Sequence, residues 1–201
     1  MFTGIVAAIG RVVDVKRHGD TARLRVHAGE LSLDQVKVGD SLCVHGVCLT
    51  VIEKLDREFA VDLSPETLAT TTLGALAPGS RVHLEAALTL ASPLSGHLVT
   101  GHVDGIGSVV ARAQQGETYR FHIRAPEIVQ RYISRKGSVC VDGVSLTVNA
   151  VEGAEFSVQI IPHTVHKTVF ADYTEGNLVH IEVDIVARYI ERLLAASKEV
   201  R

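Results

Sequence analysis

The chain of 201 residues has no tryptophan, one methionine and only 4% aromatic residues. It also lacks any apolar run of the roughly 20 residues that a membrane-spanning helix requires. Hydrophobic residues nevertheless make up 46% of the chain, so its cores must be aliphatic. The amino terminus has no basic residue ahead of its apolar stretch, and we therefore expect no signal peptide.

The chain also lacks a large net charge and a set of cysteines that could form disulfide pairs. The formal net charge is −3, which disfavours nucleic acid and anionic membranes as partners. Three cysteines make no disulfide framework and favour a reducing, cytoplasmic location. Cys43, His45 and Cys48 do not have the spacing of a zinc knuckle and no second pair follows, so we expect no metal site. No P-loop, dinucleotide fingerprint or GxSxG elbow is present.

What the chain does contain is an internal repeat. SLCVHGVCLTV at 41–51 recurs as SVCVDGVSLTV at 138–148, a shift of 97 residues. The same shift lays residues 3–13 on 100–110, and about 30 of roughly 85 gapless positions are identical. The period is too long for a solenoid unit, so each copy is a domain. We expect a first domain over 1–87, a connector over 88–96, a second domain over 97–184 and a C-terminal helix over 185–201.

Each copy reads as a small all-β barrel. Short alternating or β-branched segments follow one another between Gly, Asp and Pro, and six strands in about 85 residues is the density of an antiparallel barrel, with a sandwich as the alternative. In the first copy the expected strands are 9–15, 22–27, 41–44, 49–52, 59–63 and 81–86. Short helices are expected around 31–36 and 126–133.

The period changes after the second copy. Residues 184–196 predict an amphipathic helix, with Asp184 as its N-cap and an apolar stripe of Val186, Ile190, Leu193 and Leu194. The helix either folds back on a barrel or packs against its own copies in other subunits.

The repeat also supplies an internal control. Gly4/Gly101, Gly10/Gly107 and Gly46/Gly143 match, which indicates positive φ or close backbone approach. Most of the differences inside the matched motifs bring polar or ionisable groups into the second copy. Taken singly, each has a plain structural reading as a turn, a cap, a core residue or the outer face of a strand; together they favour two related pockets, one carrying more of the chemistry. These pairs are Ile5/His102, Gly39/Lys136, His45/Asp142, Cys48/Ser145, Glu66/His163 and Ala87/Asp184.

Several motifs together resemble one enzyme family. MFTGIV at the amino terminus, GVCLTV and GVSLTV, SPETL, IPHT and GHLVTGHVDG resemble riboflavin synthase of the α-chain type, over essentially the whole chain. The resemblance implies two tandem six-stranded antiparallel Greek-key barrels plus a C-terminal α-helix, assembled as a homotrimer through that helix. It implies no cofactor, and it raises association with lumazine synthase as a possible partnership.

The implied reaction is a dismutation, the last step of riboflavin biosynthesis. One molecule of 6,7-dimethyl-8-ribityllumazine passes a four-carbon unit to a second, which gives riboflavin and 5-amino-6-(D-ribitylamino)uracil. Each barrel would bind one lumazine, at a site between the first barrel of one subunit and the second barrel of its neighbour. Holding two rings in reacting orientation can lower the barrier by about 7–11 kcal/mol, and proton transfer adds about 10²–10⁴-fold.

The resemblance also implies site residues. His102 is the candidate for proton transfer; Ser145, with Thr147, would act at carbon 7 of the acceptor as nucleophile or by placing water; Cys48 is the equivalent group in the other pocket. No pattern in the sequence indicates a base beside Ser145. The first pocket is expected to comprise Phe2, Thr3, Gly4, Ile5, Val6, Ser41, Cys48, Leu49, Thr50, Asp62, Leu63, Ser64, Pro65, Glu66 and Thr67. The second is expected to comprise Gly101, His102, Val103, Lys136, Asp142, Ser145, Leu146, Thr147, Ile161, Pro162, His163, Thr164, Val165, His166 and Asp184.

The sequence departs from the family pattern in places. His45 stands where the family usually has Asn, Ala86 replaces a common Arg, and residues 169–171 replace the usual Thr-Leu-Gly. Two rivals remain: a relative that binds lumazine or flavin without turnover, and an assembly module trimerised by its helix.

Overall fold

The computed structural model describes residues 1–199 and folds as two closed six-stranded antiparallel barrels followed by a helix. The first barrel has the strand order β1-β2-β5-β4-β3-β6. Its strands are β1 (Ala8–His18), β2 (Thr21–His27), β3 (Ser41–Val44), β4 (Val47–Leu55), β5 (Glu58–Leu63) and β6 (Arg81–Ala86). All six expected strands of the first copy are therefore confirmed.

The second barrel repeats this plan in the order β10-β11-β8-β7-β12-β9. Its strands are β7 (Gly105–Gln115), β8 (Thr118–Arg124), β9 (Ser138–Val141), β10 (Val144–Glu152), β11 (Glu155–Ile160) and β12 (Leu178–Val183). Register shifts fall between Val12 and Asp14 and between Val109 and Ala111, which are matched places in the two copies. Such bulges increase local strand twist and help a small sheet close on itself.

The barrel interiors are mostly aliphatic, as the composition predicts, but all five phenylalanines of the chain are also buried, at no more than 2% exposed. Alternate strand residues such as Leu24, Val26, Ile123 and Val158 are fully buried, and each barrel has its own hydrophobic cluster. A smaller cluster lies where the barrels meet, and Phe2, Cys43, Val99 and Cys140 form it.

Two short helices that the pattern analysis missed occupy matched places after β5 and β11. They are α1 (Pro65–Thr70) and α3 (Pro162–Lys167), and each begins with proline, which suits a first helical turn. Ser64 caps α1 by accepting the Thr67 N–H at 3.1 Å. Short 3-10 turns follow each helix, η1 (Thr72–Ala75) and η2 (Val169–Asp172).

The helix expected around 31–36 is wrong. The segment contains a single turn at residues 34–35, and the Lys54 ammonium donates to the carbonyls of Leu33 and Val36 at 2.7 and 2.9 Å. Leu33 and Val36 are among the last four residues of the expected helix, whose carbonyls would lack internal partners, and the lysine satisfies them here. The helix expected around 126–133 is confirmed only as the single turn α2 (Glu127–Gln130).

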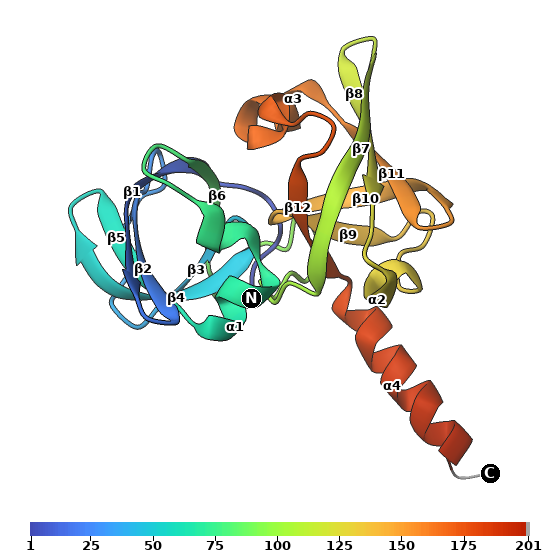
Figure 1. The fold of residues 1–201 in the computed structure, drawn as a ribbon, viewed down its shortest axis with the longest axis horizontal. Coiled ribbons are helices and arrows are strands. Elements are labelled where there is room, and N and C mark those ends of the chain that lie inside the picture. Colours follow the sequence, from blue (N-terminus) through green and yellow to red (C-terminus); the bar gives the residue numbers. More distant parts are fainter. Residues whose placement is uncertain (200–201) are drawn as a thin grey trace.

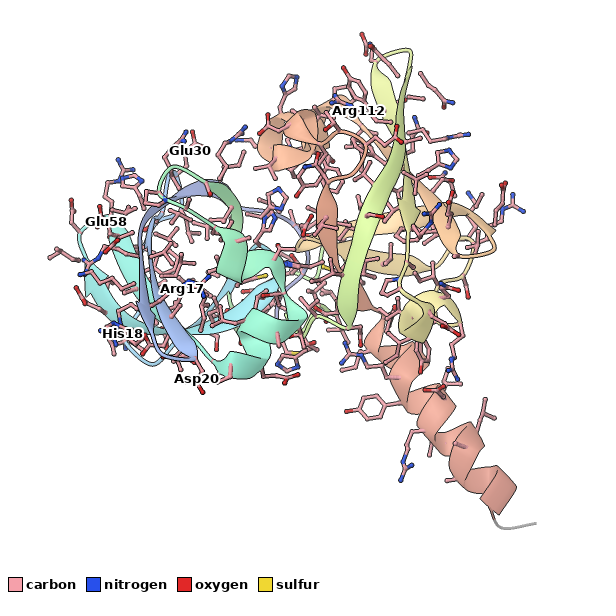
Figure 2. All side chains as sticks on the ribbon, in the orientation of Figure 1. Arg17, His18, Asp20, Glu30, Glu58 and Arg112 are labelled. Atoms are coloured by element: carbon pink, nitrogen blue, oxygen red, sulfur yellow. The ribbon has the colours of Figure 1, made fainter. Side chains whose placement is uncertain are left out.

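The C-terminal helix is confirmed as α4 (Ile185–Glu199), while residues 200–201 of the expected range lie outside the described residues; Asp184 accepts the Val186 N–H at 3.0 Å as the cap. Figure 1 shows α4 leading away from both barrels, and Figure 2 shows its outer half without a neighbouring element. Val186, Ile190 and Leu193 are 55%, 52% and 70% exposed, so the apolar stripe is not folded back on a barrel. Within residues 1–199, no helix is both long and apolar enough to cross a membrane.

Candidate functional site

The two barrels meet around a pseudo-two-fold axis marked by matched residues. Phe2 and Val99 form an antiparallel bridge, with N–H···O distances of 2.7 and 3.1 Å, and the amino terminus lies between the barrels (Figure 1). The hairpin turns His45-Gly46 and Asp142-Gly143 face each other, all with positive φ. A Cβ on Gly46 would lie 2.6 Å from the Gly143 nitrogen. Gly46 and Gly143 therefore have both a positive φ and a close backbone approach.

The segment that precedes the first strand of each barrel crosses this axis and contacts the other barrel, so the two segments are exchanged. The Ser145 N–H donates to the Gly4 carbonyl at 2.8 Å, and the Cys48 N–H donates to the Gly101 carbonyl at 2.8 Å. A Cβ on Gly4 would lie 2.6 Å from the Ser145 Cβ, and one on Gly101 would lie 2.7 Å from the Cys48 Cβ. The expected grouping is therefore wrong: residues 4–6 lie with Ser145, and residues 101–103 lie with Cys48.

This exchange defines two candidate sites. The Cys48 site comprises Cys48, Leu49 and Thr50 on β4 with residues 101–103, and the Ser145 site comprises Ser145, Leu146 and Thr147 on β10 with residues 4–6. Cys48 and Ser145 are half-buried, whereas Thr50 and Thr147 are exposed one position beyond the buried Leu49 and Leu146. Alternation along the strand thus puts a reactive group and a hydroxyl on one accessible face.

A buried carboxylate holds each exchanged segment in place. Glu85 accepts the Thr3 N–H and hydroxyl at 2.7 and 2.6 Å and the Gly4 N–H at 3.0 Å. Glu182 accepts the same three groups of Thr100 and Gly101 at 2.7, 2.6 and 2.9 Å. Burial raises the pKa of both carboxyls, and the hydrogen bonds oppose that shift. The pattern analysis did not identify these two glutamates.

A histidine that the pattern analysis also missed lies beside Ser145. The His97 Nδ1 is 2.7 Å from the Ser145 hydroxyl, and the His97 N–H donates to the Thr3 carbonyl at 3.1 Å. Burial lowers the pKa of His97, an effect that Asp184 opposes. With the proton on Nε2, Nδ1 accepts the Ser145 hydroxyl, which is the geometry of a base beside a nucleophile. His97 lies inside the GHLVTGHVDG motif, the one signal in the sequence that pointed to it.

His102 and Ile5 are the exposed residues at matched places of the exchanged segments. His102 therefore belongs to the Cys48 site, and Ile5 to the Ser145 site, as their backbones are anchored there. Lys136 is exposed with φ of 69°, and its N–H donates to the Val148 carbonyl at 2.8 Å, next to Thr147 on β10.

Other expected site residues flank these strands. Asp62 makes a bidentate pair with Arg23 at 2.8 and 3.1 Å, which holds the pKa of Asp62 below its usual range. Leu63 is buried, while Ser64, Pro65 and Glu66 are exposed and Thr67 is half-buried. In the second copy Ile161, His163 and His166 are exposed, and Pro162, Thr164 and Val165 are half-buried. Ser41 is half-buried opposite Thr50.

Asp142 lies elsewhere, which corrects its expected role in binding substrate. It is 1% exposed, and its carboxylate accepts the His180 N–H at 2.8 Å and the Tyr173 hydroxyl at 2.7 Å. The His45 Nε2 lies 3.5 Å from it. Enclosed between the barrels, Asp142 is a structural residue of the junction, and burial raises its pKa.

Histidines complete this junction. The His83 Nε2 accepts the Val169 N–H at 2.7 Å, and the His180 Nε2 accepts the Thr72 N–H at 2.8 Å. Their Nδ1 atoms lie 2.8 and 2.7 Å from the carbonyls of Asp142 and His45. Burial lowers the pKa of both His45 and His83 to about 3. We call His45, His83, His180, Asp142 and Tyr173 the junction cluster. Within residues 1–199, no group of three or more His, Cys, Asp or Glu side chains is arranged to hold a metal ion.

Comparison with known proteins defines the class first. The lumazine binding domain family matches residues 3–87 and again 100–184, so the chain is a tandem lumazine-binding-domain protein. Two structures of LumP, complexed with riboflavin and with 6,7-dimethyl-8-(1'-D-ribityl) lumazine, superpose with TM-scores of 0.85 and 0.83. Their identities are 23% and 22%, and each match covers 91% of this chain and 99% of the other, which establishes the shared fold.

Sequence relatives narrow the class to one family. Riboflavin synthase of Photobacterium phosphoreum is 45% identical over 98% of this chain and 91% of its own length. Riboflavin synthase of Mycobacterium tuberculosis (strain H37Rv) is 45% identical over 98% of this chain and all of its own, and that of Bacillus subtilis is 35% identical over 99% and 92%. The chain belongs to the riboflavin synthase family.

Proposed function

We propose that the chain converts two molecules of 6,7-dimethyl-8-ribityllumazine into riboflavin and 5-amino-6-(D-ribitylamino)uracil. One lumazine gives up a four-carbon unit, the other receives it, and the atoms balance without an added oxidant or reductant. The observation that carries the proposal is the pair of matched sites with different reactive groups, Cys48 with His102 in one and Ser145 with His97 in the other. Two similar sites suit two copies of one substrate, and their differences suit donor and acceptor roles.

In this proposal His102 moves a proton at the Cys48 site. The methyl group on carbon 7 of the lumazine is acidic because the ring delocalises the resulting anion. His102 is exposed on an anchored segment, so its imidazole can reach a ring laid against Thr50 and Cys48. Proton transfer by such a group contributes about 10²–10⁴-fold.

Ser145 acts at the other site, on carbon 7 of the second lumazine. The neighbouring His97 imidazole, kept neutral by the burial that lowers its pKa, can accept the serine proton as the oxygen attacks or as it places a water. Thr147, Lys136 and residues 4–6 would hold the ring and the ribityl chain.

We further propose a homotrimer in which the Cys48 site of one subunit faces the Ser145 site of its neighbour. The exposed stripe of Val186, Ile190 and Leu193 supports this assembly, because an exposed apolar helix face indicates an interface. The cytoplasmic location and the association with lumazine synthase stay predictions from the sequence.

The test is turnover of purified protein supplied with 6,7-dimethyl-8-ribityllumazine alone, followed by riboflavin absorbance and fluorescence. We expect riboflavin to form, and His102→Ala to slow its formation while both sites still bind ligand. Tight binding without turnover would instead support the non-catalytic binder, and a full rate in His102→Ala would remove His102 from proton transfer.

A further inference from the structure

The segment that carries His102 is held by two sets of contacts, and only one of them is shared between the repeats. The shared set is the Glu182 carboxylate, which binds Thr100 and Gly101, together with the Thr100 hydroxyl, which accepts the His102 N–H at 3.3 Å. The first repeat has the same arrangement around Glu85, where the Thr3 hydroxyl accepts the Ile5 N–H at 3.0 Å. This set therefore belongs to the common fold.

The second set occurs only beside His102 and comes from the first turns of α4. The Arg188 Nη2 donates to the His102 carbonyl at 2.9 Å and to the Asp104 Oδ2 at 2.8 Å. The same Asp104 oxygen accepts the Val183 N–H at 2.8 Å, where β12 ends before α4. Arg188 thus joins the helix to the His102 segment directly, and Asp104 extends the connection to the end of β12.

The first repeat has nothing equivalent to this second set. Ala7 stands at the place of Asp104, Ala91 at that of Arg188, and Ile5 at that of His102. The second repeat therefore carries both the ionisable His102 side chain and the second set of contacts. We call the hydrogen bonds of Arg188 to the His102 carbonyl and to Asp104 the clamp. The first barrel is not followed by a helix like α4, so these contacts occur only where a helix and an ionisable residue at the place of His102 are both present.

The clamp is expected to hold the His102 segment firmly, because its hydrogen bonds are charge-assisted and partly screened from water. The Arg188 and Asp104 side chains are 32% and 22% exposed, and hydrogen bonds between charged groups are shorter and stronger than neutral ones. His102 itself is exposed and residues 102–104 have no regular secondary structure. A proton-transferring side chain on such a segment depends on its backbone being fixed, since small displacements of a reacting group reduce rate steeply.

We propose that Arg188, held by Asp104, is a positioning residue for His102 and links the placement of helix α4 to the geometry of the Cys48 site. The proposal rests on the function proposed above. It also makes assembly relevant to rate, because any partner that packs on α4 acts on the helix that orients His102.

The test compares Arg188→Ala and Arg188→Lys with a matched control on the same helix, Glu191→Gln. Glu191 bonds Arg131 at 2.9 Å and also Tyr132, and it makes no contact with the His102 segment in the described structure. We expect Arg188→Ala to lower kcat about tenfold or more with KM nearly unchanged, Arg188→Lys to recover part of the loss, and Glu191→Gln to keep the rate.

A second readout does not depend on turnover. The imidazole carbon–proton signal of His102, assigned with His102→Gln, is expected to broaden or shift in Arg188→Ala and to stay unchanged in Glu191→Gln. Asp104→Asn is expected to give a smaller effect with folding and assembly intact, which covers the case in which Arg188→Ala fails to fold.

Full rate and an unchanged His102 signal in Arg188→Ala, or in Arg188→Lys and Asp104→Asn together, would overturn the proposal. Failure of the proposed function is distinguishable, because wild-type protein would then form no riboflavin while the His102 signal would still report the clamp.

Discussion

At the scale of single residues, the molecule is organised by pairs that the two repeats place in matched positions. Glycines at 4 and 101 allow the exchanged segments to touch Ser145 and Cys48, and glutamates at 85 and 182 fix those segments. The repeat comparison identified Cys48, Ser145 and His102 because these positions differ between copies. It did not identify Glu85, Glu182 or His97. The two glutamates are identical in the two copies, and the role of His97 depends on a contact with Ser145 that forms only in the folded chain.

The first residue-scale prediction concerns Gly101. Gly101→Ala introduces a Cβ 2.6 Å from the Cys48 nitrogen at a φ of 77°. Gly79→Ala is the matched control, because Gly79 has a φ of 93° but open space around it. We expect Gly79→Ala to cost about 1–2 kcal/mol from the backbone alone, and Gly101→Ala to cost clearly more. Equal losses in denaturant unfolding would mean that the close approach is unimportant.

The second concerns the pair His97 and Ser145. If the two act as one unit, each alanine variant lowers kcat by about 10²-fold, and the double variant is no slower than the slower single one. The double-mutant cycle measures this coupling directly. Additive losses would show that His97 and Ser145 work independently.

At the scale of elements, strands were predictable and short helices were not. Alternation and turn residues identified all six strands of the first barrel, because half-buried strands must alternate. The turns of α1 and α3 are too short for a helical period to be visible, although Pro65 and Pro162 marked their starts. The helix expected at 31–36 is absent, and the segment is held instead by Lys54, distant in sequence, which donates to the carbonyls of Leu33 and Val36.

The element-scale prediction concerns the exposed stripe of α4. Ile190→Asp or Leu193→Asp places a charge in the proposed subunit interface, where an unpaired buried charge is costly. We expect the assembly to dissociate in sedimentation velocity and turnover to fall with it, while Arg192→Ala, an exposed neighbour, leaves both unchanged. A monomeric wild type, or aspartate variants that still assemble, would contradict the interface.

At the scale of the whole molecule, the barrels are joined by a junction that requires neutral imidazoles. Sequence alone did not indicate this, because it placed Asp142 in a substrate pocket and gave His83 and His180 no role. The exchange of segments was equally invisible, since each segment precedes its own barrel in the chain and reaches the other only by tertiary packing. The duplicated fold could be predicted from the repeat, whereas the relation between the copies required the structure.

The junction predicts a pH dependence of stability. His45 and His83 have a folded pKa of about 3 against an ordinary value of 6.5, so the unfolded chain binds more protons below pH 6.5. The contribution of these two histidines to stability is therefore complete above pH 6.5. It declines as pH falls toward 3, by up to about 1.4 kcal/mol per pH unit for each histidine. Asp142, Glu85 and Glu182 have raised pKa values, so their contribution to stability decreases as pH rises. This change falls nearer the pH range in which carboxyl groups ordinarily titrate.

Unfolding free energies measured from about pH 5 to about pH 7.5 check this dependence, because this range spans the ordinary histidine pKa of about 6.5. His83→Gln should flatten the decline, because it removes one of the two imidazoles whose pKa burial lowers. A wild-type stability that does not fall on acidification would contradict neutral histidines at the junction.

The most direct test of the whole account is the stoichiometry of turnover. Purified protein is given 6,7-dimethyl-8-ribityllumazine as sole substrate, and lumazine, riboflavin and 5-amino-6-(D-ribitylamino)uracil are quantified together over time. Two matched sites acting on two copies of one substrate predict that riboflavin and the pyrimidinedione appear in equal amounts, each at half the rate at which lumazine disappears. Binding of lumazine without either product, or riboflavin formed without the pyrimidinedione, would contradict the account.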